Sequence, residues 1–228
     1  MAKNGNHSDT RGLILQAALK SFADCGYAGT SVQQIVDNAR VSKPALYYYF
    51  GDKAGLFQAL VDQAHDERLH LMQQAASRGA TVAEKLEEIL TELFEYAVRN
   101  RELVRLGFAT AFAAPGENPP KLNCREKGRR NFEFIATLIS AGQESGELDR
   151  RFDSDDLAMG IYGQLNSYVM LRLLAPECFP LKRQTARRIV QLFMQGAASK
   201  SHTTNANGAK KIAAPRISRN RRLTAKKD

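Results

Sequence analysis

Three consecutive tyrosines, Tyr47, Tyr48 and Tyr49, are the residues of this sequence whose type and spacing most plainly indicate binding chemistry. Successive residues of an α-helix point about 100° apart, so three in a row cannot all be buried. At least one hydroxyl then faces solvent, where it can donate a hydrogen bond to a phosphate oxygen, and Lys43 and Lys53 flank the run. Simple packing of the rings would also explain a tyrosine run, but the surrounding pattern favours contacts to nucleic-acid phosphates.

The segment around the tyrosines has the pattern of two short helices joined by a tight turn. Thr30-x-x-Gln33 and Ser31-x-x-Gln34 both have the form of a capping box at the start of the first helix. Ser42 can cap the second helix. The opposite face of that second helix is free to enter a major groove, which predicts a helix-turn-helix DNA-binding domain. The apolar residues expected to pack the pair together are Val32, Ile35, Val36, Val41 and Leu46.

The rest of the chain is predicted to be helical as well, because apolar residues recur at i, i+3 and i+4 without sustained alternation. We expect an all-α fold of about nine helices. Its first helix should begin at Thr10, and Gly26 should stop it. The predicted parts are a flexible N-terminus (1–9), a three-helix helix-turn-helix domain (10–57), a larger helical domain (58–198) and a disordered basic tail (199–228).

The net charge of +9 belongs almost wholly to the tail. Residues 199–228 hold nine Lys or Arg and one acid, a net of +8, which leaves +1 for the rest of the chain. The total charge therefore says little about the folded part. Two interpretations of the tail stay open: a solvated disordered end, or an arm that binds DNA without sequence preference.

Composition and spacing also exclude several classes of protein. No apolar run approaches the roughly 18 to 20 residues that cross a bilayer, and residues 1–9 lack the apolar region of a signal peptide, which predicts a cytoplasmic, nucleoid-associated protein without membrane contact. Three separated cysteines, Cys25, Cys124 and Cys178, are expected to be reduced thiols. His65 and His70 are spaced five apart, unlike the pair of a zinc helix. With no glycine-rich phosphate loop and no Ser, His and Asp set, we expect no enzyme, no cofactor and no metal.

Four motifs carry a resemblance to a known family: Thr30-Ser31, Val41-Ser42-Lys43, the run from Leu46 to Phe50, and Asp52-Lys53-x-x-Leu56-Phe57. From about Thr10 to Leu60 the chain resembles the TetR family of bacterial transcriptional regulators. The resemblance implies a homodimeric repressor that binds a palindromic operator in double-stranded DNA and is released by a small molecule bound in its larger domain. The alternative is a dimeric DNA-binding protein, or an activator, that needs no effector.

The resemblance also implies a role for individual residues. Phe50 would be a buried anchor. Arg40 stands where the family usually has glycine, and a left-handed conformation would cost a non-glycine residue roughly 1 to 2 kcal/mol. Either the turn differs, or Arg40 is kept for a phosphate contact. Base contacts are implied for Lys43, Pro44 and Tyr47, and phosphate contacts for Thr30, Ser42, Tyr48, Tyr49 and Lys53.

An effector of the family's kind would occupy a largely apolar cavity between helices. Residues 153–174 and 181–197 are expected to form the last two helices and, by the resemblance, the dimer interface; the first contributes the stripe Leu157, Ile161, Leu165, Val169 and Leu173. Each cavity candidate could equally be core, and a cavity beside Phe108 and Phe132 would favour the ligand-responsive repressor. The candidates are the aromatic residues Phe94, Phe108, Phe112, Phe132 and Tyr162, with Gln164 and Asn166 to orient the ligand.

Overall fold

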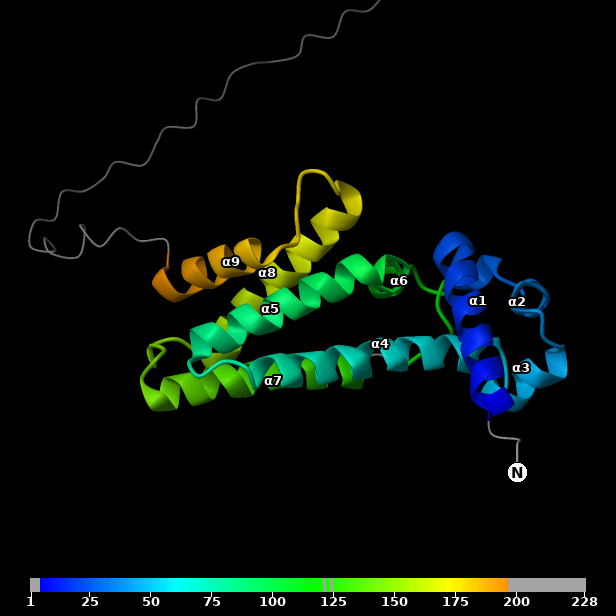
Figure 1. Ribbon diagram of the computed structural model, residues 1–228, viewed down its shortest axis with the longest axis horizontal. Helices are drawn as coiled ribbons and strands as arrows, with labels where there is room; N and C mark the ends of the chain where they lie inside the picture. The colour runs from blue at the N-terminus through cyan, green and yellow to red at the C-terminus, as the bar shows by residue number, and fades with distance from the viewer. Residues whose placement is uncertain (1–4, 121, 124, 197–228) are drawn as a thin grey trace, which may run out of the picture. The chain divides into compact units, whose positions relative to one another are not determined.

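The computed structural model describes residues 5–120, 122–123 and 125–196. Nine helices, α1 to α9, and no strand are found in these ranges, so the predicted all-α fold is confirmed (Figure 1). None of the helices in the described ranges is long and apolar enough to cross a membrane. Cys124 and the predicted basic tail lie outside the described residues.

The first three helices form the predicted helix-turn-helix unit: α1 (Gly5–Gly29), α2 (Val32–Ala39) and α3 (Lys43–Phe50). α1 begins at Gly5 rather than at the predicted Thr10, since the residues between them include no proline to interrupt the helix. Gly26 has a φ of 70°, and the helical geometry breaks there, as predicted.

Side-chain caps fix where α2 and α3 begin. The Gln34 N–H donates to Ser31 Oγ at 3.2 Å, and the Ser31 N–H donates to Gln34 Oε1 at 2.9 Å. Of the two predicted capping boxes, the one opened by Ser31 forms. The Ala45 N–H donates to Ser42 Oγ at 3.4 Å, so Ser42 caps α3 as predicted, with Pro44 in the first turn.

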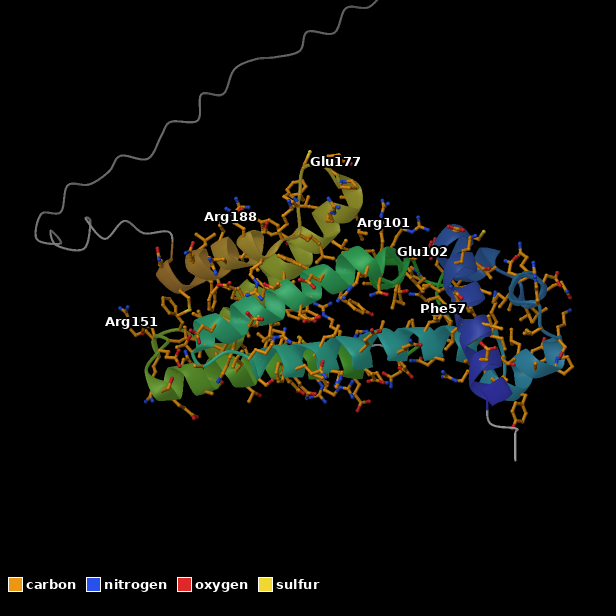
Figure 2. All side chains as sticks on the ribbon, viewed as in Figure 1. Phe57, Arg101, Glu102, Arg151, Glu177 and Arg188 are labelled. Carbon is orange, nitrogen blue, oxygen red and sulfur yellow. The ribbon has the colours of Figure 1, made fainter. Side chains whose placement is uncertain are left out.

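An apolar core holds this unit against the start of α4 (Lys53–Ala76). Leu46 of α3 is fully buried in it. The rings of Phe22 and Phe57 meet edge to face with centroids 5.0 Å apart, and Phe57 lies where α4 meets α1 (Figure 2). A Cβ at Gly55 would lie 2.1 Å from the Phe50 carbonyl oxygen, so only glycine lets α4 begin this close to α3. This packing turns the Leu46 side of α3 inward and its opposite side outward.

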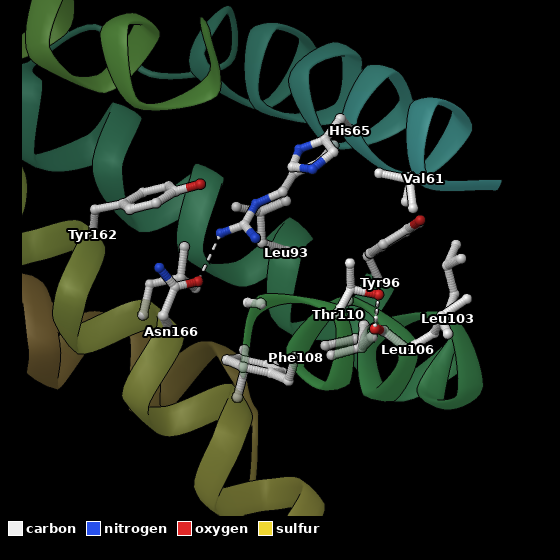
Figure 3. A pocket seen from close by; sticks show the side chains of 18 of the residues that line it. Val61, His65, Leu93, Tyr96, Leu103, Leu106, Phe108, Thr110, Tyr162 and Asn166 are labelled. Carbon is white, nitrogen blue, oxygen red and sulfur yellow. Dashed lines mark hydrogen bonds between the residues drawn. The ribbon is translucent and has the colours of Figure 1, made fainter. Parts of the chain in front are cut away.

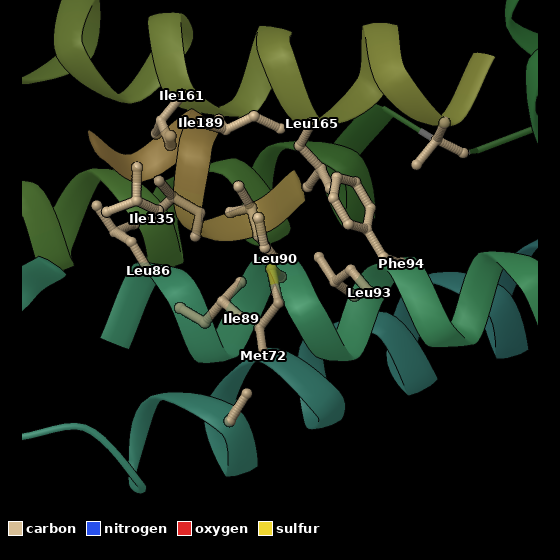
Figure 4. Packing of buried hydrophobic residues seen from close by; sticks show 14 of the residues in the cluster. Met72, Leu86, Ile89, Leu90, Leu93, Phe94, Ile135, Ile161, Leu165 and Ile189 are labelled. Atoms are coloured by element: carbon tan, nitrogen blue, oxygen red, sulfur yellow. The ribbon is translucent and has the colours of Figure 1, made fainter. Parts of the chain in front are cut away.

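The remaining helices are α5 (Val82–Arg99), α6 (Arg101–Phe112), α7 (Arg125–Ser145), α8 (Ser154–Leu174) and α9 (Arg183–Gln195). α5 is the centre of this part, because it packs against α4, α6, α7, α8 and α9. Its apolar side chains meet others from four neighbouring helices (Figure 4). The contacts shown include Leu90 and Phe94 of α5, Met72 of α4, Ile135 of α7, Ile161 of α8 and Ile189 of α9.

The stripe predicted on the eighth helix has a different role from the one expected. Ile161, Leu165 and Val169 are buried in the chain's own core, so they are not surplus surface for a partner. α8 needs this side inward because α5 and α7 pack against it. This inward side of α8 is not available to a partner.

Two helices join the helix-turn-helix unit to the larger part. α4 contacts α1 near its start and then runs along α5 and α7, and α6 also packs against α1 (Figure 1). A shift of either helix would therefore change its contacts with α1.

Candidate nucleic-acid interface and cavity

α3 presents one continuous exposed strip. Lys43, Pro44, Tyr47 and Tyr48 are exposed, with 46% of Tyr47 and 78% of Tyr48 accessible. Residues three and four apart lie on the same side of a helix, so these four side chains are neighbours. Ser42 is exposed at the helix start. The structure thus brings together most of the residues predicted to contact DNA.

Two predicted phosphate contacts conflict with the geometry. Thr30 is 2% exposed, and its hydroxyl oxygen lies 3.0 Å from the Ser21 carbonyl oxygen and 2.7 Å from that of Gly26, so its one hydrogen is donated within the chain. The prediction for Thr30 is therefore wrong. Lys53 Nζ donates to the carbonyl oxygens of Tyr27 at 2.9 Å and Thr30 at 2.8 Å, and it lies 4.3 Å from the centroid of the Tyr27 ring. Lys53 consequently ties α4 to the end of α1 and to Thr30, which follows it, a structural role that the prediction did not include.

The turn between α2 and α3 keeps a strained residue. Arg40 is exposed and has φ 55° and ψ 44°, the left-handed conformation that glycine adopts without cost. Its N–H donates to the Asp37 carbonyl oxygen at 3.2 Å. Arg40 thus has the same left-handed conformation that glycine would have at this position, which excludes the first of the two alternatives, a turn of different geometry.

Phe50 is not the buried anchor that was predicted. It is partly exposed, and the guanidinium carbon of Arg11 lies 5.3 Å from its ring centroid. The buried side chain of α3 is Leu46, because Leu46 lies on the side that faces α1 and α2.

A cavity of about 520 Å³ lies between α4, α5, α6 and α8 (Figure 3). Four of the seven candidates from the sequence line it, namely Phe108, Phe112, Tyr162 and Asn166. No group of three or more His, Cys, Asp or Glu that could hold a metal occurs among the described residues.

The other three predicted lining residues lie elsewhere. Phe94 is fully buried in the core of the larger part, with its ring centroid 6.4 Å from that of Tyr168. Phe132 packs edge to face against Tyr162 with centroids 6.0 Å apart and supports that ring without lining the cavity. Gln164 is two residues from Asn166, about 200° around the helix, so it cannot share the side that faces the cavity.

The polar end of the cavity is built on a residue that the sequence reading missed. Arg68 of α4 donates from Nη2 to Asn166 Oδ1 at 3.1 Å, and its guanidinium carbon lies 4.9 Å from the centroid of the Tyr162 ring. Its Nε is buried and has no hydrogen-bond acceptor. The spacing of Val61, His65 and Arg68 places them on one side of α4. A cation on the apolar side of a helix was therefore the feature of the sequence that could have predicted the role of Arg68.

Two titratable groups beside Arg68 are held neutral by their surroundings. Burial, and then the positive charges of Arg68 and Lys127, lower the pKa of His65 below its usual value, so the imidazole is uncharged at neutral pH. Burial, and then the nearby Glu67 carboxylate, raise the pKa of the Tyr96 hydroxyl, which donates to Glu67 Oε2 at 3.2 Å. The charged group that faces the cavity is therefore Arg68.

The wall formed by α6 is attached directly to the helix-turn-helix unit. Leu106 lines the cavity and is also buried in the core that holds α1 to α3. Arg105 donates to the Ala23 carbonyl oxygen and pairs with Asp24 at 3.2 Å, both on α1. Val61 of α4 likewise belongs to both the cavity lining and that core. A molecule in the cavity would thus touch side chains that hold α1 in place.

Comparisons with known proteins agree with this architecture. Residues 14–60 match the sequence profile of the bacterial regulatory proteins of the tetR family. The transcriptional regulator TtgR of Pseudomonas putida is 38% identical over 180 residues, which cover 76% of this chain and 84% of TtgR. The chain aligns with only 32% and 47% of the lengths of two other curated relatives, YuxN and YttP of Bacillus subtilis.

Two solved structures align with a larger share of this chain than TtgR does. The fatty acid degradation regulator FadR of Bacillus halodurans has a TM-score of 0.71 and 20% identity, covering 82% of this chain and 99% of that one. FadR of Bacillus subtilis, solved with stearoyl-CoA, has a TM-score of 0.68, with the same identity and coverage. Together with the match to TtgR, these likenesses show that the chain belongs to the tetR family of bacterial regulatory proteins.

Proposed function

We propose that this protein is a transcriptional repressor of the cytoplasm and nucleoid, which binds a palindromic operator as a homodimer and leaves it when a small molecule binds. The observation that carries the proposal is the exposed strip of α3 over the buried Leu46. A helix held in this way can enter a major groove with its first residues against base edges. Base contacts are assigned to Lys43, Pro44 and Tyr47, and phosphate contacts to Ser42, Tyr48 and Tyr49.

The outer side of α8 supports a dimer. Met159 and Leu174 are exposed on this helix, and Leu192 is exposed on α9. A Cβ at Gly160 or Gly163 would meet no atom within 4 Å, so small residues leave room for another helix to approach closely. Exposed apolar and small residues together suit a helix bundle formed with a second copy.

The cavity supports control by a small molecule rather than binding to DNA alone. Its volume is in the range of roughly 300 to 1,000 Å³ that is usual for ligand sites, and α4 and α6 connect its lining to α1. A ligand that fits the cavity better in one position of these helices shifts the equilibrium toward that position. FadR of Bacillus subtilis, which has this fold, was solved with stearoyl-CoA. A mostly apolar lining with one charged group supports ligand binding, and not catalysis, as the activity of the cavity.

The test is selection of bound sites from random-sequence duplexes by the full chain. The proposal expects one enriched motif with two-fold symmetry, whose half-sites lie about one helical turn, ~10 base pairs, or a multiple of it apart. Sedimentation of the protein on that duplex should give two copies per site. An unenriched pool, or a single asymmetric half-site bound by one copy, would overturn the proposal. Repeating the binding with small molecules extracted from cells separates an effector-controlled repressor from a protein that binds DNA regardless.

A further inference from the structure

The guanidinium of Arg68 is charged, faces the cavity and has spare donors. Within the described part of the chain, the guanidinium donates one hydrogen bond, to the uncharged Asn166, and its buried Nε has no acceptor. No carboxylate of the described residues lies within 4.0 Å of it. Arg68 is half-buried. A cation that is partly removed from water and has no ion-pair partner becomes more stable when an anion binds beside it.

We propose that the effector is an amphipathic anion, with a carboxylate head that binds Arg68 and an apolar body that lies against α6. This inference rests on the effector role proposed for the cavity and names the chemical class of its ligand. A carboxylate can accept two parallel N–H bonds from a guanidinium, a geometry that an alcohol or an amide cannot match in strength.

The two ends of the cavity differ in the way that such a ligand requires. Tyr162 and Asn166 of α8 lie at the end occupied by Arg68, and the hydrogen bond to Asn166 is drawn there (Figure 3). Leu103 and Leu106 line the end formed by α6, where the Thr110 hydroxyl is satisfied by the Leu106 carbonyl oxygen at 2.7 Å. An apolar chain can therefore be buried at this second end without leaving the Thr110 hydroxyl without a hydrogen-bond partner.

The charge of the site favours a single negative charge. Arg68 is the one cation among the described residues that line the cavity, since burial keeps His65 neutral. Lys127, whose charge acts on His65, does not line the cavity and is bound by Asp62 at 3.3 Å and Asp66 at 2.8 Å. A carboxylate balances Arg68, whereas a phosphate monoester, with close to two charges, brings one that the cavity does not balance.

The experiment compares three eight-carbon probes by calorimetry on the full chain without DNA: octanoate, 1-octanol and octyl phosphate. We expect octanoate to bind about ten- to a hundredfold more tightly than octanol, the range for hydrogen bonds to a charged group. Octyl phosphate should bind more weakly than octanoate. Octanol binding as tightly as octanoate would overturn the proposal, and so would failure of all three to bind. Tighter binding of octyl phosphate would overturn the assignment of a carboxylate head.

Variants locate the head group. Arg68→Gln should bring octanoate affinity down to that of octanol while leaving octanol binding as in the wild type, which also shows that the cavity is intact. Arg101→Gln is the matched control, since this arginine of α6 is exposed and does not line the cavity (Figure 2). It should bind octanoate like the wild type. Equal losses in the two variants would overturn the role of Arg68, and the wild-type comparison stands even where Arg68→Gln fails to fold.

The outcome is separable from that of the proposed function. Octanoate that binds through Arg68 without lowering DNA affinity supports the head-group assignment and contradicts release by the ligand. Sequence-specific DNA binding by a protein that binds none of the probes supports the DNA-binding proposal and overturns this inference.

Discussion

Replacing Arg40 by glycine should make the protein more stable and its DNA binding weaker. Arg40 has φ 55° in the turn between α2 and α3. The left-handed conformation costs a residue with a Cβ about 1 to 2 kcal/mol, and glycine removes that cost. Glycine also makes the unfolded chain freer, which offsets about 0.4 to 1 kcal/mol of the gain. With the middle of each range, the net increase in unfolding free energy is about 0.8 kcal/mol, or about 2 to 3 °C in midpoint for a chain of this length.

Arg40→Ala is the matched control, because it removes the guanidinium and keeps the strained backbone. Its unfolding free energy should stay within about 0.5 kcal/mol of the wild type. Strain that survives in a structure marks a functional constraint, and an exposed cation beside α3 is suited to a phosphate. Both variants should then lose DNA affinity alike on all sequences, with a salt-dependence slope lower by about 0.9 for each copy, or about 1.8 for the homodimer.

Denaturant unfolding followed by circular dichroism measures the first effect, and fluorescence anisotropy with labelled duplexes at several salt concentrations measures the second. Equal stability of the glycine and alanine variants would refute the strain argument. Unchanged affinity in both variants would refute the phosphate contact.

Two further predictions concern the lysine at the start of α4 and the basic tail. Lys53→Met should lower the stability of the helix-turn-helix unit by about 1 to 3 kcal/mol, because two backbone carbonyls lose their donor; faster hydrogen exchange in α1 and α2 would report it, and Lys20→Met, an exposed lysine of α1, should change exchange little. Equal effects of the two variants would contradict the role given to Lys53. Deleting residues 199–228, which carry nine Lys or Arg, should weaken binding to all duplexes and flatten its salt dependence, while a loss confined to one sequence would count against a non-specific arm.

The local features of the fold were predictable because their physics lies within a few residues of the chain. The capping box opened by Ser31, the cap at Ser42 and the break at Gly26 each depend on neighbours at most four positions away. The exposure of the tyrosine strip followed from helix geometry alone. These features fix where α3 begins and which of its sides faces outward.

The features that were missed depend on contacts between distant segments. Lys53 meets carbonyls 23 and 26 positions earlier, and Arg68 meets Asn166 98 positions later. Phe94 and Phe108 are both aromatic residues in apolar helices, so the sequence does not distinguish them. Phe94 is core because α5 lies in the middle of the larger part, whereas Phe108 of α6 lines the cavity. Thr30 could be read as a cap or a phosphate ligand until its burial against α1 was known.

The central claim, that the exposed strip of α3 reads base sequence, is tested most directly by Tyr47→Ala. Loss of a base contact costs about 1 to 3 kcal/mol in each half-site. The affinity of each copy for the selected operator should then fall about five- to a hundredfold, and that of the homodimer by the product of the two losses, while affinity for unrelated duplexes stays the same. Tyr48→Phe, which removes only an exposed hydroxyl, should weaken binding to all duplexes alike. A Tyr47→Ala variant that keeps the wild-type preference for the operator over unrelated DNA would contradict the account.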